Sequence, residues 1–425
     1  MASKAIEAAQ AISASRYRYV VTFYMLLAVL VAYLDRLNIS VLIADKAFVT
    51  DMGIANDPVR QGMLMSGFLI VYGVANVFLS PLGDVMGPRK ALSLSLALWA
   101  ICMAVGGLVS SFAWMLTMRL VLGVSEGPQM AMSSKYVKNW FPSAERGKAN
   151  SIWQLGLKLA PGLGMPFFAW LIVIRGWRFS FFVMSAATAV PLILFWFFTT
   201  DHPNQCPFVN QKERDYIQAG SKADDGSGAI TVKEGVKYFV KDYRYWLLVI
   251  YYTCHCSVMW GIMTWLPSYL KKARGFSWAG MGTWVAFSYV FAICLVLLTG
   301  YISDRIGRRA PFNVLAMGVV AIGLYISISV HSNMGAALAI SIANGALGLG
   351  IVTVWTLMQQ LVPTQAVAAG AGVMNGISNG IAGLAPAIIG YFVGLTGGFA
   401  GGFMYVIGSA LVGLLCTLIL ALQKY

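Results

Sequence analysis

The stretch Arg119-Leu-Val-Leu-Gly-Val-Ser-Glu-Gly-Pro-Gln129 lies within an apolar segment that runs from about residue 114 to residue 136. Its Arg119 and Glu126 are seven residues apart, which is two turns of a helix, so both side chains lie on one helix face. An ionisable group in lipid is costly unless it faces protein or water. The stretch therefore predicts a membrane helix with one face turned to an internal polar surface.

Two further apolar segments carry the same kind of polar residue. The segment 19–44 contains Tyr33-Leu-Asp35-Arg36-Leu-Asn38, and the segment 151–174 contains Lys158. The rise per residue of a helix places Asp35, Arg36 and Arg119 in the outer half of the membrane and Glu126 and Lys158 near its middle. We expect these helices to enclose a polar cavity that takes an anion.

The composition identifies the class of protein. The chain has 425 residues, of which 59% are hydrophobic and 11% are charged, and its mean hydropathy is +0.72. Soluble domains have about a quarter of their residues charged. The first apolar run is long enough to span a membrane, rather than to be removed as a signal peptide. The sequence predicts an all-α membrane protein that crosses the bilayer many times.

Twelve apolar stretches are long enough to span the bilayer, six on each side of one hydrophilic segment. They cover roughly 19–44, 61–83, 91–112, 114–137, 151–174, 177–198, 245–270, 279–303, 311–331, 334–361, 366–395 and 398–422. We therefore predict a six-helix bundle over residues 1–198, a cytoplasmic linker over 199–243 and a second six-helix bundle over 244–425.

The positions of Lys and Arg predict the orientation. With the N-terminus inside, 20 of the 30 Lys and Arg residues lie in inner segments and 7 in outer ones. Inner loops of membrane proteins are enriched in these residues, so both termini are predicted to be cytoplasmic. The net charge of +14 is then explained by topology and the lipid surface, and it does not indicate a nucleic-acid partner.

A loop motif occurs in both halves. Asp84 precedes Gly87 and the basic pair Arg89-Lys90, and 220 residues further on Asp304 precedes Gly307 and the pair Arg308-Arg309. An Asp in a tight turn can cap a helix or pair with Arg. We expect Asp84, Arg89, Asp304, Arg305 and Arg308 to hold one conformation and release in another. An ordinary positive-inside loop is the alternative, but it would not explain two copies in register.

Twelve spans in two halves with this repeated loop resemble the major facilitator superfamily, and in particular its anion:cation symporter family. That family includes bacterial hexuronate and galactonate transporters, sialin and the vesicular glutamate transporters. The matching motifs are Tyr33-Leu-Asp35-Arg36, Arg119-Leu-Val-Leu-Gly123-Val-Ser-Glu126-Gly127, Asn139-Trp-Phe-Pro142, Glu145-Arg-Gly147, Gly176-Trp-Arg178 and Trp260-Gly-Ile-Met-Thr-Trp265-Leu-Pro-Ser-Tyr-Leu270. The resemblance implies transport of an organic anion across a bacterial inner membrane, with these spans around one cavity.

The charged residues suggest distinct roles. Arg presents a planar fork that suits a carboxylate, so Arg36 or Arg119 is a candidate ligand for the substrate, and we place Tyr33 beside them. Asp35 and Glu126 are the only acids deep in the predicted spans, and they are the candidate proton carriers. The alternative is that Arg119 and Glu126 form a fixed structural ion pair.

Lys158 departs from the family, whose members usually carry a neutral Gln at this position that contacts the substrate. Three intramembrane bases then outnumber two intramembrane acids, and an unbalanced buried charge is costly. The sequence therefore favours a dianionic substrate, such as an aldarate or another dicarboxylate, over a monoacid sugar. Alternatively, Lys158 pairs with Glu126 or extends to the membrane surface.

Asn375 and Asn379 lie one helical turn apart in the second half and are further candidates for substrate binding. Polar packing between helices would explain them equally well. Trp260, Trp265 and Trp278 fit an aromatic belt at the outer surface, and one of them could instead line the substrate. Cys254-His255-Cys256 does not indicate a metal, because alternating positions point to different sides of a helix.

These patterns predict a proton-coupled symporter that imports a small organic anion by alternating access and acts as a monomer in the bilayer. The coupling ion is a proton rather than sodium, and no cofactor, metal or enzymatic activity is expected. No phosphate-binding loop, metal spacing or nucleophile–base set is visible in the sequence. The rival hypothesis is a passive facilitator or channel, which would not need Asp35 and Glu126.

Overall fold

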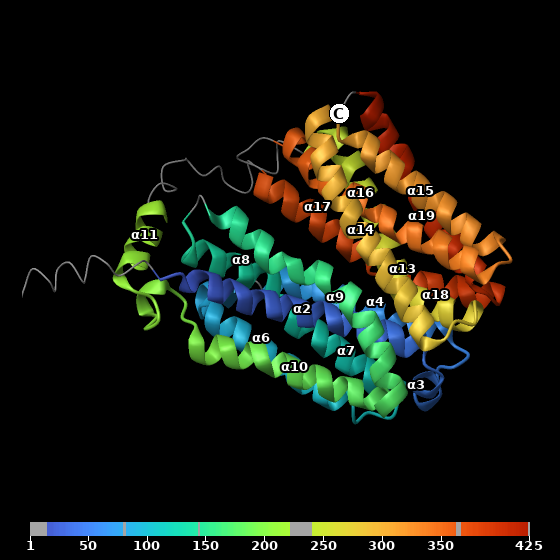
Figure 1. Ribbon diagram of the computed structural model, residues 1–425, viewed down its shortest axis with the longest axis horizontal. Coiled ribbons are helices and arrows are strands. Elements are labelled where there is room, and N and C mark those ends of the chain that lie inside the picture. Colours follow the sequence, from blue (N-terminus) through green and yellow to red (C-terminus); the bar gives the residue numbers. More distant parts are fainter. Residues whose placement is uncertain (1–14, 80–81, 143–144, 222–239, 363–366, 424–425) are drawn as a thin grey trace, which may run out of the picture.

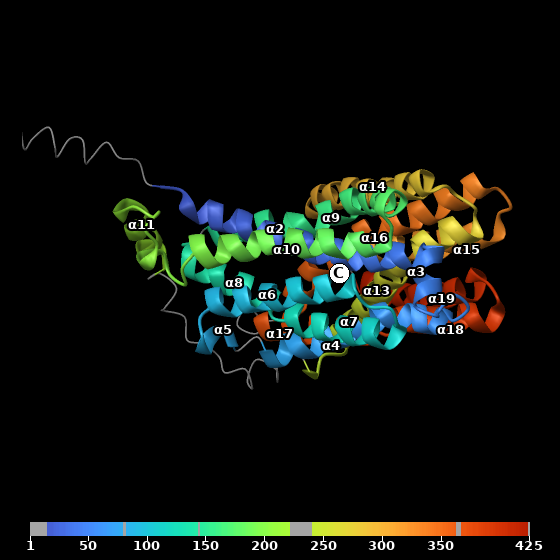
Figure 2. The same cartoon turned by 90° about the horizontal axis from the view of Figure 1, so that it is seen from below.

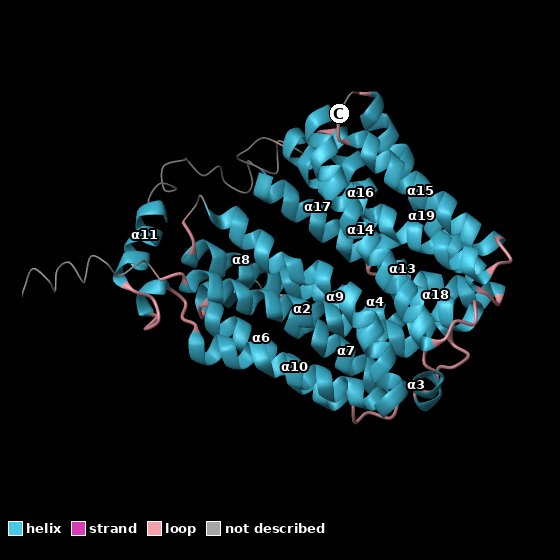
Figure 3. Ribbon diagram, in the orientation of Figure 1, coloured by secondary structure: helices cyan, strands magenta, loops and turns pink. Residues whose placement is uncertain are grey.

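The structure is a computed structural model that describes residues 15–79, 82–142, 145–221, 240–362 and 367–423. Every regular element in these ranges is a helix, as Figure 3 shows. The side chains of Asp84, Lys158 and Asp304 fall outside the description, although their backbones belong to helices. The all-α class predicted from the composition is confirmed.

The helices of the first half gather into one bundle, and those of the second half into another (Figures 1 and 2). The first bundle contains α2 (Tyr17–Ala44), α4 (Pro58–Leu79), α5 (Leu82–Val85), α6 (Pro88–Gly106), α7 (Phe112–Glu126), α8 (Gln129–Trp140), α9 (Arg146–Arg175) and α10 (Trp177–Phe198), with the short α3 (Lys46–Asp51) after α2. The second contains α13 (Tyr243–Ser268) with the π-turn η4 (Tyr269–Ala273), α14 (Trp278–Ile306), α15 (Ala310–Ser329), α16 (Asn333–Leu361), α17 (Val367–Ala382), α18 (Ala385–Thr396) and α19 (Phe399–Leu422).

Within the described residues, ten helical segments are long and apolar enough to cross a membrane. They coincide with ten of the twelve predicted spans. The other two are α4, which carries Arg60 and Gln61, and the α7–α8 pair, which contains Arg119 and Glu126. Arg60 is exposed near the start of α4, and α7 and α8 are each shorter than a membrane span. The twelve-helix organisation is therefore consistent with the structure.

Two predicted spans are divided in the structure. The span 114–137 is split after Glu126 into α7 and α8, and the span 366–395 is split after Ala382 into α17 and α18. Pro128 precedes the first residue of α8 and Pro386 is the second residue of α18. Proline has no backbone N–H to continue the ladder of a helix, which explains both interruptions.

The two bundles are in contact at the end of the molecule that holds α3. A Cβ added to Gly62 of α4 would lie 2.3 Å from the carbonyl oxygen of Pro386, and one added to Gly390 of α18 would lie 2.2 Å from that of Pro58. Only glycine permits so close an approach of two backbones. Lys272 adds a hydrogen bond across this seam, with its Nζ 2.7 Å from the carbonyl oxygen of Ile43. In Figure 1 the ribbons diverge towards the opposite end, where α11 (Gln211–Ser221) lies.

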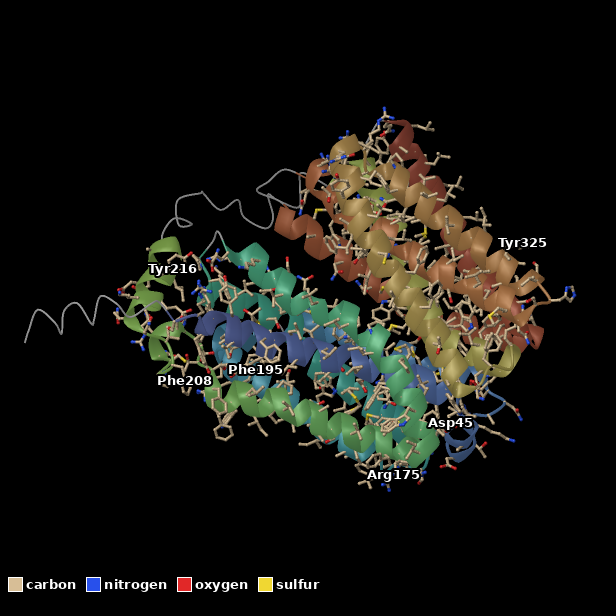
Figure 4. The ribbon with its side chains drawn as sticks, viewed as in Figure 1. Asp45, Arg175, Phe195, Phe208, Tyr216 and Tyr325 are labelled. Carbon is tan, nitrogen blue, oxygen red and sulfur yellow. The ribbon has the colours of Figure 1, made fainter. Side chains whose placement is uncertain are left out.

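The linker helix α11 is attached to the first bundle. Glu213 is fully buried, and its carboxylate accepts hydrogen bonds from Arg18 Nη1 at 2.8 Å and from Ser15 Oγ at 2.6 Å. Tyr216, labelled at this end of Figure 4, donates to Glu145 Oε1 at 2.9 Å. These contacts anchor α11 at the start of α2. The exact domain limits at residues 198 and 243 stay a prediction.

Candidate functional site

Two buried ion pairs join α2 to α7. Arg119 Nη1 lies 2.9 Å from Asp35 Oδ2, and Arg36 Nη2 lies 3.1 Å from Glu126 Oε2. None of the four side chains is more than 2% exposed. Consecutive helix residues point about 100° apart, so Asp35 and Arg36 can reach two partners that lie two turns apart on α7. The alternative of an Arg119–Glu126 pair within one helix is therefore wrong.

The two acids each keep one oxygen without a donor. Asp35 Oδ1 and Glu126 Oε1 have no hydrogen-bond partner among the described residues, although the two carboxyl groups lie close enough to interact with each other. Two ionised carboxylates cannot hydrogen-bond, because both are acceptors. A proton on one of them would supply a donor for the other. The arrangement can thus store a proton beside two fixed positive charges.

Arg36 differs from Arg119 in its surroundings. The guanidinium of Arg36 lies 4.5 Å from the ring centre of Tyr33, 4.8 Å from that of Tyr72 and 5.7 Å from that of Trp260 in the second bundle. Such contacts between a cation and an aromatic ring hold the charge in place while leaving the fork available for an anion. Arg36 therefore lies where the two bundles meet.

Arg119, in contrast, lies inside the first bundle. Its Nε donates to the carbonyl oxygen of Leu64 at 3.1 Å, and its guanidinium lies 4.4 Å from the ring centre of Phe68. The Arg119 side chain is fully buried. Together with Asp35 it satisfies most of its donors within the protein, so it is placed to orient Asp35 rather than to contact a substrate.

The facing side of the second bundle supplies uncharged polar groups. Trp260 Nε1 donates to Asn379 Oδ1 at 3.2 Å, Asn379 Nδ2 donates to Asn375 Oδ1 at 2.9 Å, and Tyr252 donates to the same Asn375 oxygen at 3.5 Å. Asn375 is exposed and Asn379 is half-buried. These amides lie on α17 and connect through Trp260 to Arg36, so the structure brings the predicted residues of the two halves together.

The prediction of an outer aromatic belt is wrong for Trp260 and Trp265. Trp260 is only 4% exposed and Trp265 only 1%, and the indole of Trp265 donates to the carbonyl oxygen of Pro386 at 2.9 Å. Both lie near the C-terminal end of α13, but the sequence did not show which side of the helix they occupy. Their indole N–H groups bond across to α17 and α18 instead of facing lipid.

Lys158 lies on α9, but its side chain falls outside the described residues. The helix itself packs closely against α2, because a Cβ added to Gly156 would lie 2.8 Å from the backbone nitrogen of Leu30. Further along α9, Pro166 packs against Gly282 of α14. Helix α9 therefore borders both bundles. The role of Lys158 as a second cationic group of the site stays a prediction.

The repeated loops both contain a left-handed glycine. The φ angles of Gly87 and Gly307 are +85° and +70°, a conformation that favours glycine, and the two residues are related by the same 220-residue shift as Asp84 and Asp304. The tight turns of the repeat are confirmed. The side chains of both acids lie outside the described residues, so their predicted gating contacts stay untested.

The basic residues of the two loops have different partners. The backbone N–H of Arg89 donates to Asp201 Oδ1 at 2.7 Å, and its side chain donates to the carbonyl of Trp196. Arg305 packs against Tyr301, with 4.2 Å from its guanidinium to the ring centre, and Arg308 is exposed. The first loop is thus fastened to the end of α10 within its own bundle.

Several site residues were not selected from the sequence. Phe68 and Tyr72 of α4 enclose the guanidinium of Arg36, at 5.3 Å and 4.8 Å from their ring centres, and Tyr252 binds Asn375. The spacing of Phe68 and Tyr72, four residues on one helix face, is the signal that could have identified them. It is a weak signal, since aromatic residues at this spacing occur on lipid-facing helices too.

Comparison with known proteins agrees with this geometry. A family model described as Major Facilitator Superfamily matches residues 25–387. The "Probable sulfoacetate transporter SauU" of Cupriavidus necator is 29% identical over 366 residues, which cover 84% of this chain and 83% of that protein. The "Probable L-galactonate transporter" of Escherichia coli K12 is 25% identical over 373 residues, covering 85% of this chain and 80% of that protein.

A solved structure shares the fold. The crystal structure of a bacterial homolog of the human lysosomal transporter Spinster, in an inward-facing and unoccupied conformation, superposes with a TM-score of 0.78 at 16% identity. The likeness covers 97% of this chain and 99% of that one. At this level of identity it establishes the arrangement of helices alone.

Proposed function

The chain belongs to the Major Facilitator Superfamily and is similar to transporters of its anion:cation symporter type, and we propose that it is a proton-coupled symporter for a small organic anion. The protein is a multipass membrane protein whose fold supports secondary transport.

The Arg36–Glu126 pair carries the proposal. Arg36 lies at the junction of the two bundles, in contact with Trp260, and its fork is bound by a carboxylate of the protein itself. A substrate carboxylate can replace Glu126 on that fork if Glu126 takes up a proton at the same time. The number of negative charges beside Arg36 then stays constant, which avoids an uncompensated buried cation. Proton and anion would enter together for this reason.

Asp35 supplies a second proton site. Its carboxyl group interacts with that of Glu126 and is held by Arg119. Two interacting acids take up their protons in two steps that belong to the pair rather than to either residue alone. Arg119 would then fix the geometry of Asp35, and the predicted choice between Arg36 and Arg119 as the substrate ligand favours Arg36.

We further propose a dianionic substrate whose second charge is bound by Lys158. Sulfoacetate, for which one relative is named, carries a sulfonate as well as a carboxylate, whereas the galactonate of the other relative carries a single carboxylate. Lys158 favours the first of these patterns. Asn375 and Asn379 would bind the neutral part of the substrate, since amides both donate and accept hydrogen bonds.

Alternating access would proceed by movement of one bundle against the other. The glycine contacts Gly62–Pro386 and Gly390–Pro58 close the α3 end, and the ribbons diverge at the α11 end (Figure 1). We propose that the structure represents the inward-facing state and that Asp84, Arg89, Asp304, Arg305 and Arg308 help to close the opposite end in the outward-facing state.

The cellular setting follows from the charge distribution and the relatives. We propose a bacterial inner-membrane protein with both termini and the linker 199–243 in the cytoplasm. We propose that the protein functions as a monomer. Transport needs no cofactor or resident metal beyond the coupling proton, and the protein catalyses no chemical reaction.

The test separates proton coupling from substrate binding. Protein in liposomes would be supplied with labelled sulfoacetate, with an acidic exterior to drive accumulation, and in a second assay with equal concentrations on both sides to measure counterflow exchange. We expect wild type to concentrate substrate until a protonophore is added. Glu126→Gln and Asp35→Asn should lose accumulation, while exchange survives in at least one of them. Protonophore-insensitive uptake that never exceeds equilibration would favour the passive facilitator instead.

A further inference from the structure

A line of buried polar side chains runs from Glu126 towards the linker end of the first bundle. Gln129, Ser133 and Tyr136 follow Glu126 at spacings of three, four and three residues, so all four lie along one helix face. Gly127 and Pro128 both have right-handed angles, so the face carries on across the break between α7 and α8. We call Glu126, Gln129, Ser133 and Tyr136 the polar stripe, which is about 15 Å long at the usual helical rise.

The middle of the polar stripe is unsatisfied by protein groups. Both side-chain atoms of Gln129 and the hydroxyl of Ser133 are buried and have no hydrogen-bond partner among the described residues. Gln129 is 2% exposed and Ser133 is fully buried. A buried polar group without a partner costs roughly 1–3 kcal/mol, and three such atoms on one face are unusual in a folded protein.

Helix α6, which packs against α7 and α8, adds buried groups of the same kind. Ser95 Oγ donates to the carbonyl oxygen of Ser125 at 2.7 Å, which fixes the register of α6 beside the end of α7. Ser93 lies two residues further towards the linker end and Trp99 one turn in the other direction. Ser93 Oγ and Trp99 Nε1 are buried and unpartnered among the described residues as well. Helix α6 thus carries two further unsatisfied groups within about one turn of its contact with the end of α7.

The linker end of the stripe leads to the surface. Thr199 Oγ1 donates to the carbonyl oxygen of Phe195, a residue labelled in Figure 4, at 2.7 Å, so Tyr136 is the donor in its 3.1 Å contact with Thr199. Thr200 follows and bonds the carbonyl of His202 in an exposed turn. Hydroxyl groups therefore continue the line from Ser133 to the exposed turn after α10.

We propose that the polar stripe holds a file of buried water that carries protons between Glu126 and the solution at the linker end. This inference rests on the proposed proton coupling. Spacings of three or four residues leave about 4.5–6 Å between neighbouring side chains along the axis, which a single water can bridge, and buried water typically bonds to otherwise unsatisfied polar groups. Protons would then move inside the first bundle, apart from the substrate between the two bundles.

The first test detects the water directly. Millisecond radiolysis of the protein in nanodiscs oxidises buried side chains that adjoin bound water. Trp99 should be labelled, whereas Trp265 should not, because the two indoles are each 1% exposed but Trp265 Nε1 is already bonded to the carbonyl oxygen of Pro386. Equal protection of Trp99 and Trp265 would overturn the proposal, whatever the transport assays show.

The second test measures proton delivery. Gln129→Leu and Ser133→Ala keep the approximate shape of the stripe and remove its hydrogen-bonding groups. We expect pH-driven uptake to slow by at least about tenfold and its solvent deuterium isotope effect to rise, while counterflow exchange stays near the wild-type rate. Ser180→Ala is the matched control, since Ser180 is equally buried in the same bundle but bonded to the carbonyl oxygen of Trp177 at 2.7 Å.

The outcomes separate the two proposals. If wild type moves no protons with substrate, the proposed function fails, and labelling of Trp99 still reports whether the water exists. If wild type is proton-coupled but Gln129→Leu and Ser133→Ala retain wild-type uptake, the proton path lies elsewhere. Equal loss of uptake and exchange in these variants would show a structural role for the stripe and would also overturn the proposal.

Discussion

The two bundles share a fold but differ in their interior chemistry. The first bundle buries Asp35, Arg36, Arg119 and Glu126, whereas no Asp, Glu, Lys or Arg is among the buried residues described in the second. The second bundle instead buries neutral groups such as Asn313, which accepts hydrogen bonds from Tyr251 and Thr353. This difference fits the proposal that the first bundle binds the coupling protons and the anionic group and that the second binds the neutral part of the substrate.

Removing one charge from the first bundle should have the largest effect on stability. Arg119→Gln leaves Asp35 buried without its partner, and breaking a buried ion pair in this way typically costs about 3–5 kcal/mol. The matched change in the second bundle, Asn313→Leu, removes only neutral hydrogen bonds and should cost about 1–3 kcal/mol. Thermal unfolding in detergent measures both.

A double variant tests the cause of that effect. In Arg119→Gln with Asp35→Asn no charge remains unpaired, and we expect much of the lost stability to return. Equal destabilisation by Arg119→Gln and Asn313→Leu, with no recovery in the double variant, would contradict the contrast between the two interiors.

The next effect is on substrate affinity. Arg36→Lys keeps the charge but loses the planar fork, and we expect affinity to fall by at least about tenfold, which corresponds to 1.4 kcal/mol, while the protein still folds. Asn379→Ala in the second bundle should weaken binding less, since a neutral hydrogen bond contributes about 0.5–1.5 kcal/mol. Thermal-shift titration with sulfoacetate measures both. Near-normal substrate affinity of Arg36→Lys would show that the anion does not bind at Arg36.

Lys158→Gln in the first bundle tests the substrate class. It removes the charge but keeps a polar side chain, so it should weaken binding of a diacid more than that of the matching monoacid, by over about 1 kcal/mol for a lost charge-assisted hydrogen bond. Galactarate and galactonate are a suitable matched pair. An equal loss for both acids, or a wild-type preference for the monoacid, would exclude a role of Lys158 in selecting dianions.

The smallest effect concerns the linker. Burial alone would raise the pKa of Glu145, but hydrogen bonds from Arg18, Tyr216 and Tyr19 outweigh it, and the pKa lies below its ordinary value. A lowered folded-state pKa contributes stability above the unfolded value, and that stability is lost as the pH falls through the folded value. Glu145→Gln should therefore flatten the loss of stability in acid. An unchanged profile between pH 6 and pH 3 would show that Glu145 contributes nothing measurable.

The sequence predicted the helices better than the contacts between them. Long apolar segments determine where spans begin and end, and all twelve expected spans correspond to helices or helix pairs. Which charges pair depends on the rotation of α2 against α7, and periodicity alone does not fix that angle. The sequence therefore could not predict that Arg119 pairs with Asp35 and Arg36 with Glu126. Trp260 was misplaced for a similar reason, because an indole near a helix end can face lipid or protein.

In the loops, too, local turns were predictable from the sequence, whereas contacts between distant segments were not. The 220-residue repeat predicted two tight turns, and the positive φ angles of Gly87 and Gly307 confirm them, because a left-handed turn places a local demand on residue type. The attachment of α11 through Glu213 was not predictable, since the buried partner of a surface-like acid depends on packing between segments about 200 residues apart.

The most direct measurement follows protons and substrate together. Wild-type protein in tightly sealed liposomes would be given sulfoacetate without a pH gradient, and a dye would record the external pH. The account predicts a substrate-dependent rise in external pH as protons enter with the anion, abolished by a protonophore and absent in Glu126→Gln. Uptake of the anion with no change in external pH, or the same change in Glu126→Gln as in wild type, would contradict the claim that the Arg36–Glu126 pair couples protons to transport.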